Sequence, residues 1–274
     1  VTMHLEDNEL VALIGPNGAG KTTLFNLLTG VIPPSEGTVS LQTDQGLQVL
    51  NKKKPYQVAQ AGLARTFQNI RLFKDLSVLD NVLIDMTAKH KESFVSSILR
   101  LPSYYKKEVE MREEAIELLK IFDMQDKLDN LARNLPYGEQ RRLEIVRALA
   151  TKPKILFLDE PAAGMNPEET ADLTRLIRQI QNEFHITVLL IEHDMSLVMN
   201  VAERIYVLEY GQLIAEGTPA EIQKNERVIQ AYLGGESYCY CKLKTCPFIM
   251  VWSTMFTRLI LKSTKARSYH WSGQ

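Results

Sequence analysis

Continuous apolar runs alternate with segments of helical spacing along much of the chain. The runs at residues 9–14, 155–158 and 187–191 are typical of strands that are buried on both faces of a parallel sheet. Strands that alternate with helices predict an α/β fold. The other elements predicted from the pattern are helices at 22–28 and 168–184, a closing helical region at 219–233, and a hairpin at 205–209 and 213–216.

A largely helical region interrupts this alternation between residues 67 and 150. Within it, residues 109–122 carry apolar side chains at helical spacing and charges on the opposite face, and residues 141–150 predict another helix. Ahead of it, residues 38–41 and 47–50 predict a small antiparallel pair of strands. We therefore expect an α/β core with a small antiparallel β subdomain and a helical insertion subdomain.

A glycine-rich loop stands between the first predicted strand and the first predicted helix. Its sequence, GPNGAGKT at residues 15–22, matches the phosphate-binding pattern GxxxxGK[ST]. Glycines allow close backbone approach, and the helix N-terminus adds partial positive charge. Lys21 suits the β- and γ-phosphates of ATP and Thr22 suits Mg²⁺; the alternative is a glycine-rich turn with an incidental lysine. The residues expected to bind nucleotide here are Gly15, Pro16, Asn17, Gly18, Ala19, Gly20, Lys21, Thr22 and Thr23.

Polar side chains also follow the later predicted strands. Asp159 and Glu160 end an apolar run, which places both carboxylates at the carboxyl edge of the sheet, where ligands bind. Asp159 suits Mg²⁺ and Glu160 suits polarising the attacking water, although two acidic residues can also simply end a strand. His193 follows the next strand, where contact with the γ-phosphate competes with a structural role. Gln68 draws interest only because it stands where the helical region begins.

In this order, the motifs resemble those of ABC transporter ATP-binding subunits over residues 1–235. The resemblance implies a P-loop NTPase fold with a RecA-like core, a single ATP-binding domain over residues 1–235, and ATP hydrolysis with ATP and Mg²⁺ bound. It identifies Gln68 as the Q-loop residue and His193 as the switch histidine, so that the catalytic residues are Glu160, His193 and Gln68. The implied metal ligands are Thr22, Gln68 and Asp159.

The sequence LPYGE at residues 135–139 resembles the signature motif of this family. By resemblance, this motif closes over the ATP held by a second ABC ATPase subunit, and the helix from Arg141 directs its positive end at that nucleotide. Two composite ATP sites in a head-to-tail homo- or heterodimer follow. The signature residues expected to contact nucleotide are Leu135, Tyr137, Gly138 and Glu139.

The segments ALIGPNGAGKTTLFNLLTG, ARTFQNIRLF, LPYGEQRRLEI, DEPAAGMNP and IEHDMSLVM are most similar to importer subunits for branched-chain amino acids. Urea-type and lipopolysaccharide-exporter ATPases are alternatives. The resemblance implies transmembrane permease subunits as partners, an indirect periplasmic or extracellular solute-binding protein, and a peripheral position on the cytoplasmic face of the membrane. With a net charge of −1 there is no basic field for nucleic acid, and no run approaches the roughly 20 apolar residues of a membrane span. A soluble ABC ATPase that acts on nucleic acid or ribosomes, or an inactive fragment, are the competing interpretations.

The chain departs from the family pattern in its motifs and at its start. Pro136 stands where the signature motif usually has serine, and Asn166 stands where an aspartate is usual. Proline has no N–H or hydroxyl to donate, so the serine's role does not carry over. The first strand and the adenine-stacking aromatic that the family normally has before the segment at Val1 are missing. We expect weaker nucleotide binding and an exposed sheet edge as a result.

Residues 236–274 differ from the rest of the sequence. They hold all three cysteines, Cys239, Cys241 and Cys246, both tryptophans, and no clear period. A metal site, a family-specific tail and a membrane-touching segment at 247–261 are alternatives. The interpretation we favour is a frameshifted downstream gene. When the possible codons from Lys242 onward are read from the third base of each codon, one allowed translation resembles the start of another ABC ATPase. The coding DNA decides this, and a frameshifted tail has no evolved fold.

Overall fold

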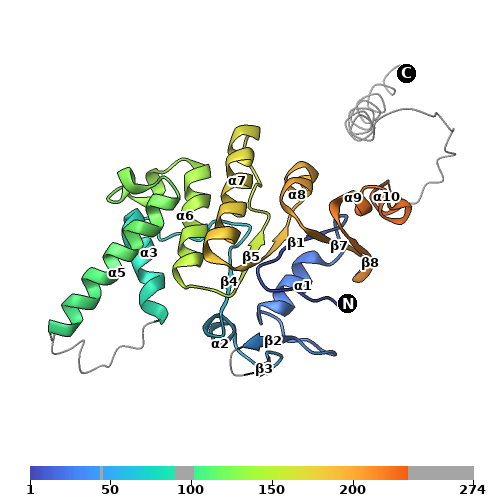
Figure 1. Ribbon diagram of the computed structural model, residues 1–274, viewed down its shortest axis with the longest axis horizontal. Coiled ribbons are helices and arrows are strands. Elements are labelled where there is room, and N and C mark those ends of the chain that lie inside the picture. Colours follow the sequence, from blue (N-terminus) through green and yellow to red (C-terminus); the bar gives the residue numbers. More distant parts are fainter. Residues whose placement is uncertain (44–45, 90–101, 234–274) are drawn as a thin grey trace, which may run out of the picture. The chain divides into compact units, whose positions relative to one another are not determined.

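The computed structural model describes residues 1–43, 46–89 and 102–233. A six-stranded sheet in the order β4-β5-β6-β1-β7-β8 forms its centre (Figure 1). Neighbouring strands are parallel except β8, which pairs antiparallel with β7. A second sheet consists of β2 and β3, paired antiparallel. The strands are β1 (Leu10–Ile14), β2 (Ser40–Thr43), β3 (Gly46–Val49), β4 (Leu63–Arg65), β5 (Ile155–Asp159), β6 (Thr187–Ile191), β7 (Arg204–Glu209) and β8 (Gln212–Gly217).

Helices cover both faces of the large sheet, as parallel strands require. Those that begin and end in the described part of the chain are α1 (Lys21–Leu28), α2 (Pro55–Gln60), α3 (Val78–Lys89), α5 (Pro102–Ile121), α6 (Tyr137–Ala150), α7 (Pro167–Phe184), α8 (Met195–Val201), α9 (Pro219–Ile222) and α10 (Glu226–Leu233), with short 3₁₀ turns at Gln125–Lys127 and Ala132–Asn134. Figure 1 shows α3, α5 and α6 gathered beside the sheet, with α2 next to β2 and β3. None of the helices in the described ranges is long and apolar enough to cross a membrane.

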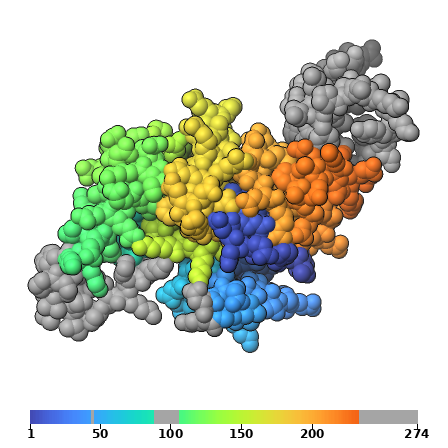
Figure 2. Space-filling model, viewed as in Figure 1, coloured from blue at the N-terminus to red at the C-terminus, as the bar shows by residue number. Residues whose placement is uncertain are grey.

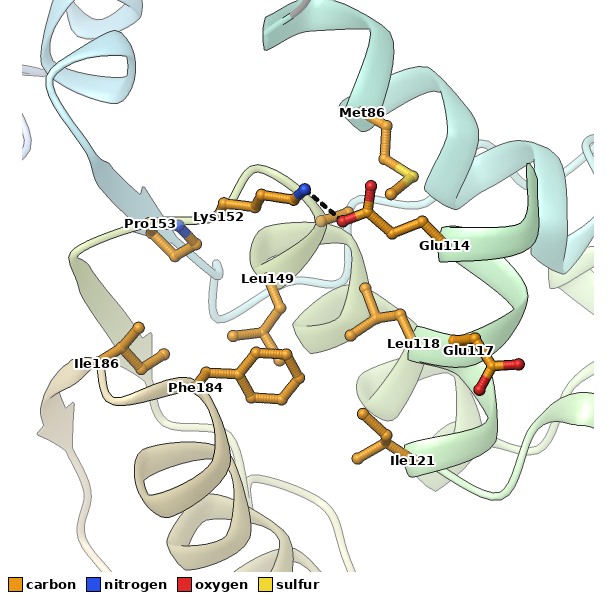
Figure 3. A pocket seen from close by; sticks show the side chains of 11 residues that line it. Met86, Glu114, Glu117, Leu118, Ile121, Leu149, Lys152, Pro153, Phe184 and Ile186 are labelled. Atoms are coloured by element: carbon orange, nitrogen blue, oxygen red, sulfur yellow. Dashed lines mark ion pairs between the residues drawn. The ribbon is translucent and has the colours of Figure 1, made fainter. Parts of the chain in front are cut away.

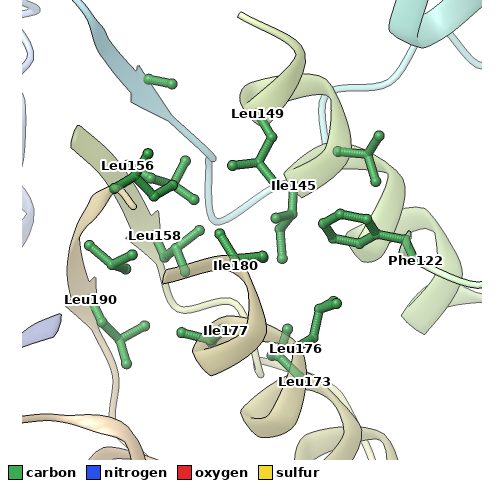
Figure 4. Close-up of a cluster of buried hydrophobic side chains, with 14 of the residues drawn as sticks. Phe122, Ile145, Leu149, Leu156, Leu158, Leu173, Leu176, Ile177, Ile180 and Leu190 are labelled. Carbon is green, nitrogen blue, oxygen red and sulfur yellow. The ribbon is translucent and has the colours of Figure 1, made fainter. Parts of the chain in front are cut away.

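The apolar strands divide their side chains between two hydrophobic cores. Leu156, Leu158 and Leu190 belong to the core on the α6 and α7 face, whereas Phe157 and Leu189 belong to the other core, with Phe25 of α1. Figure 4 shows the first core, in which Ile145 and Leu149 of α6 and Leu173, Ile177 and Ile180 of α7 gather beside Leu156, Leu158 and Leu190 of the strands. Full burial of one such side chain stabilises the fold by about 1.5–3 kcal/mol. Because alternate residues of one strand serve opposite cores, the strand reads as a continuous apolar run.

The N-terminal residues contact β7, which comes late in the described part of the chain. Met3 and Leu5 pack against the second core, and Arg204 of β7 donates hydrogen bonds to the carbonyl of His4 at 3.1 Å and to Glu9 at 2.7 Å. The first segment, dark blue in Figure 2, accordingly lies beside the orange atoms of residues from about 200 onward on the surface.

The predicted α/β architecture is confirmed, including the small antiparallel sheet and the helical insertion. The prediction that the signature helix starts at Arg141 was wrong, because α6 begins at Tyr137, with Pro136 at its N-cap. The start of this helix was missed because its first turn, Tyr137 to Gln140, lacks apolar side chains at helical spacing. The short elements β4, α2 and α8 were not predicted, and the closing region is two helices, α9 and α10. Residues 236–274, with the three cysteines and the frameshift hypothesis, lie outside the described residues.

An apolar pocket of about 460 Å³ lies where the helical region meets the amino ends of the core strands. Figure 3 shows Leu118 and Ile121 of α5 across from Leu149, Phe184 and Ile186, with the Glu114–Lys152 ion pair at the rim. Since the predicted functional residues follow the carboxyl ends of the strands, this pocket is at the opposite edge of the sheet.

Candidate functional site

The glycine-rich loop connects the end of β1 to the start of α1. A Cβ at Gly15 would lie 2.1 Å from the carbonyl oxygen of Leu208, so the close approach of the loop to β7 excludes every other residue there. Gly20 has a φ of 99° at the N-cap of α1, a left-handed conformation that favours glycine. The first N–H groups of α1 have no acceptor inside the helix, which makes this end of α1 suited to phosphate oxygens.

Lys21 lies inside the loop, with only 7% of its surface exposed. Its Nζ donates hydrogen bonds to the carbonyl oxygens of Gly15 at 2.7 Å and Pro16 at 3.1 Å. Burial lowers the pKa of Lys21, and the nearby carboxylate of Glu160 acts in the opposite direction. The lysine charge is therefore aimed at the cradle, and Glu160 is close enough to act on it.

The β7–β8 turn and α10 both form hydrogen bonds with the glycine-rich loop. The N–H of Gly211, in the β7–β8 turn, donates to the carbonyl of Ala19 at 2.8 Å. Tyr232 of α10 hydrogen-bonds to the backbone of Gly15, and burial raises the pKa of this tyrosine to about 12. Sequence reasoning missed both supports, because neither residue belongs to a recognised motif.

Gln68, Glu160 and His193 come together at the carboxyl ends of β4, β5 and β6. The Nε2 of Gln68 donates to Oε2 of Glu160 at 2.8 Å, and Nε2 of His193 lies 2.7 Å from Oε1 of Glu160. The imidazole is 44% exposed and the carboxylate 18% exposed, so the cluster opens to solvent. Glu160 has a φ of 47°, a left-handed conformation that costs free energy in a non-glycine residue. Both oxygens of Glu160 are thus held by side chains from the loops that follow the two neighbouring strands, β4 and β6.

Asp159 is buried in an ion pair that sequence reasoning missed. Its Oδ2 accepts a hydrogen bond from Arg65 at 2.7 Å, and both side chains are less than a tenth exposed. Arg65 also donates to Oδ1 of Asn26 at 2.7 Å and lies over the rings of Phe25 and Phe67. The only sequence signal was an arginine three residues before Gln68, which reads equally well as a surface residue. Among the described residues, no group of three or more histidine, cysteine, aspartate or glutamate side chains is placed to hold a metal ion.

The Gln68 loop is held to α6 by a buried ion pair, Arg141–Glu144. Arg141 is fully buried and donates to the carbonyls of Phe67 at 2.6 Å and Gln68 at 2.7 Å, and to Glu144 at 2.8 Å. Glu144 accepts from the N–H groups of Phe67 at 3.4 Å and Arg71 at 3.3 Å. Burial raises the pKa of Glu144 and Arg141 opposes that shift. The helix that carries the signature motif therefore also positions Gln68.

The signature residues lie at and just before the first turn of α6. Leu135 is buried, Gly138 faces the Glu169 side chain, and Tyr137 accepts a hydrogen bond from Arg141 at 3.3 Å. Glu139 pairs with Lys127 at 2.5 Å. Within the described ranges, no hydrogen bond or ion pair joins residues 135–139 to residues 15–23. One chain therefore presents the two motifs separately.

Comparison with known proteins identifies the family to which the chain belongs. The sequence pattern of the ABC transporter family matches residues 1–163, and that of the branched-chain amino acid ATP-binding cassette transporters matches residues 212–238. LivG of Escherichia coli K12, a high-affinity branched-chain amino acid transport ATP-binding protein, is 46% identical over 234 residues, covering 85% of this chain and 90% of LivG. LptB, the ATP-binding protein of the lipopolysaccharide export system of the same organism, is 35% identical over 85% of this chain and 89% of LptB.

Among solved structures, the ADP conformation of MJ1267, an ATP-binding cassette of an ABC transporter, superposes with a TM-score of 0.72 and 32% identity. The match covers 86% of this chain and 91% of MJ1267. A P-loop on a parallel sheet, a helical insertion and long matches to several cassettes lead to one conclusion: the chain belongs to the ABC transporter family.

Proposed function

We propose that this chain is an ATP-hydrolysing subunit that powers the import of branched-chain amino acids. The observation that carries the hydrolytic part is the cluster of Gln68, Glu160 and His193 beside the phosphate loop, with Glu160 acting electrostatically on Lys21. A carboxylate held on both oxygens, next to a cationic phosphate cradle, is the arrangement needed to orient a water against a phosphoryl group.

The residues of the loop and the strand ends have separate tasks in this proposal. The N–H groups of residues 15–23 and the Lys21 ammonium bind the polyphosphate. Glu160 accepts a proton from the attacking water, and His193 fixes the carboxylate and reaches the γ-phosphate. Thr22, Gln68 and Asp159 supply oxygen donors of the kind that Mg²⁺ prefers, and bound Mg²⁺ would neutralise charge on the β- and γ-phosphates. The carboxylate of Asp159 is already held by Arg65 at 2.7 Å, which keeps its position fixed.

The site is half of a working unit. Leu135, Tyr137, Gly138 and Glu139 would cover the nucleotide of a second ABC ATPase subunit, identical or different. The lack of any hydrogen bond or ion pair between residues 135–139 and 15–23 in the described part of the chain supports this arrangement. With Pro136 at the N-cap of α6, the hydrogen bonds to that nucleotide come from backbone N–H groups at the helix start. Transmembrane permease subunits, fed by a solute-binding protein, would hold the chain at the cytoplasmic face of the membrane.

The solute is proposed from similarity alone. LivG, a branched-chain amino acid transport protein, is 46% identical to this chain, whereas the lipopolysaccharide export protein LptB is 35% identical. The second value keeps lipopolysaccharide export as the alternative.

The test is reconstitution with the permease subunits and solute-binding protein of a branched-chain amino acid importer. Vesicles that hold the complex should take up radiolabelled leucine only when ATP is supplied, and Glu160→Gln should stop uptake. ATP hydrolysis without leucine uptake would refute the importer proposal, and absence of hydrolysis in the assembled complex would refute the catalytic one.

A further inference from the structure

We propose that Glu192 is a positioning residue that joins the loop carrying Glu160 to the loop carrying His193. The inference rests on the proposed ATPase function and adds to it a residue outside the expected catalytic group. Glu192 lies between the last residue of β6 and His193, and only 4% of its surface is exposed.

The Glu192 carboxylate accepts hydrogen bonds from both loops. Its Oε1 accepts from the N–H of Ala162 at 2.7 Å, two residues beyond Glu160. Its Oε2 accepts from the N–H of His193 at 3.0 Å and, more weakly, from that of Asp194 at 3.4 Å. One side chain therefore spans the gap between the turn after β5 and the turn after β6.

This link stands where the backbone ladder between the two strands ends. Asp159 and Ile191 are the last paired residues of β5 and β6, and the N–H of Glu160 then donates to the carbonyl of Ile191 at 2.9 Å. Beyond that bond, the two loops are no longer paired as strands. Glu160, the first residue of its loop, is in a left-handed conformation with a φ of 47°. A strained residue keeps such a conformation only when its surroundings hold it. Backbone bonds at Glu160 give part of that restraint, and Glu192 adds to it through the N–H of Ala162, so that the 2.7 Å contact between Glu160 and His193 is kept.

Helix capping does not explain Glu192. Asp194 already caps α8, since its side chain accepts from the N–H groups of Ser196 and Leu197. No lysine or arginine in the described ranges forms an ion pair with Glu192. Burial raises the pKa of the Glu192 carboxyl, and the hydrogen bonds from the three N–H groups oppose that shift. The fold thus buries a carboxyl group without a counter-ion, which costs free energy, and its hydrogen bonds all go to the two loops of the site.

Backbone N–H groups donate to both oxygens of Glu192, so the side chain at this position must accept hydrogen bonds at both ends. An ionised carboxylate accepts on both oxygens, whereas a glutamine amide turns its NH₂ toward one set of N–H donors. Glu192→Gln has the same shape, yet it breaks the link on one side. Misplacement of a catalytic group by about 1 Å costs up to about a hundredfold in rate, so we expect kcat for ATP to fall about ten- to a hundredfold. The KM for ATP should stay within about twofold, because the phosphate loop is untouched.

The control is Glu203→Gln, at an exposed glutamate that also bridges two donors. Glu203 also accepts on both oxygens, from Gln181 at 2.9 Å and from the N–H of Leu10 at 3.4 Å, but at the amino edge of the same sheet. Both variants are assayed in the complex with the permease subunits, with melting temperatures measured alongside. Wild-type and Glu160→Gln rates test the ATPase proposal itself, whereas the ratio of Glu192→Gln to wild type tests the positioning role.

A double-mutant cycle separates positioning from general loss of stability. If Glu192 acts through His193 and Glu160, Glu192→Gln should lose most of its effect on kcat in the His193→Ala background. If Glu192→Gln does not fold, Glu192→Asp keeps both acceptors on a shorter arm and should give a smaller fall in kcat with the same unchanged KM. Additive effects in the cycle, an equal fall in Glu203→Gln, or wild-type kcat in a folded Glu192 variant would each overturn the proposal.

Discussion

At the scale of single residues, the site depends on charged groups whose partners fix where they point. Glu160 is held by Gln68 and His193, Asp159 is held by Arg65, and Lys21 is turned into its own loop. A side chain held in this way needs little reorganisation when substrate arrives, which is the condition for efficient electrostatic catalysis.

Glu160→Gln should abolish most hydrolysis while leaving nucleotide binding intact. The amide keeps the size of the side chain but cannot take a proton from water, so we expect kcat to fall by about 10²–10⁴-fold. The measurement is phosphate release by the assembled complex together with ATP affinity. Glu168→Gln, an exposed carboxylate in the first turn of α7, is the control and should retain wild-type turnover. A Glu160→Gln variant as fast as wild type would remove Glu160 from the mechanism.

Arg65→Ala should destabilise the fold, because it leaves Asp159 charged and buried without its partner. Loss of one partner from a buried pair costs about 3–5 kcal/mol. Urea unfolding checks this, with Arg133→Ala as the control. Arg133 pairs with Asp75 at the surface, where both side chains are more than half exposed, and such pairs contribute about 0–1 kcal/mol. Equal losses in the two variants would show that the Arg65–Asp159 pair has no special weight.

At the scale of helices and strands, α6 has two roles, since it begins with the signature motif and holds the Gln68 loop through Arg141. We expect Arg141→Ala to lower the free energy of unfolding by about 3–5 kcal/mol, because Glu144 is left buried and unpaired. Arg142→Ala is the neighbouring control: its partly exposed pair with Asp172, at 3.2 Å, should contribute about 1 kcal/mol or less. Denaturant titration of both variants decides the matter, and similar midpoints would contradict the role of the Arg141–Glu144 pair in holding the Gln68 loop.

Sequence patterns predicted the strands in which consecutive residues are apolar and buried. β1, β5 and β6 supply apolar side chains to cores on both faces, so their runs were visible, and the positions of Glu160 and His193 followed. β4 has three residues, too few for a pattern. Arg65, Arg141, Glu144 and Glu192 were not predicted, because a charged residue gives no sign in sequence that tertiary partners will bury it.

At the scale of the whole molecule, the proposed function needs a second subunit, because the phosphate loop and the signature turn of one chain form no bond with each other in the described residues. Leu135 to Glu139 have no hydrogen bond or ion pair with residues 15–23 in the described part of the chain, and Tyr137 is 44% exposed. In the proposed dimer, ATP bound at one loop would meet the helix start of another subunit, where backbone N–H groups and the helix dipole favour anions.

We expect the Glu160→Gln variant, which binds ATP without consuming it, to associate only when ATP is present. Light scattering should then give twice the 31.2 kDa mass of the chain if the dimer is homomeric. If the dimer is heteromeric, the same shift should appear only after the companion ATPase subunit is added. Lys21→Ala combined with Glu160→Gln is the control and should stay monomeric, because the polyphosphate loses its main cation. If Glu160→Gln stays monomeric with ATP and the companion subunit, the signature turn does not complete the site. The same mass with and without ATP would show that nucleotide does not bridge the two chains.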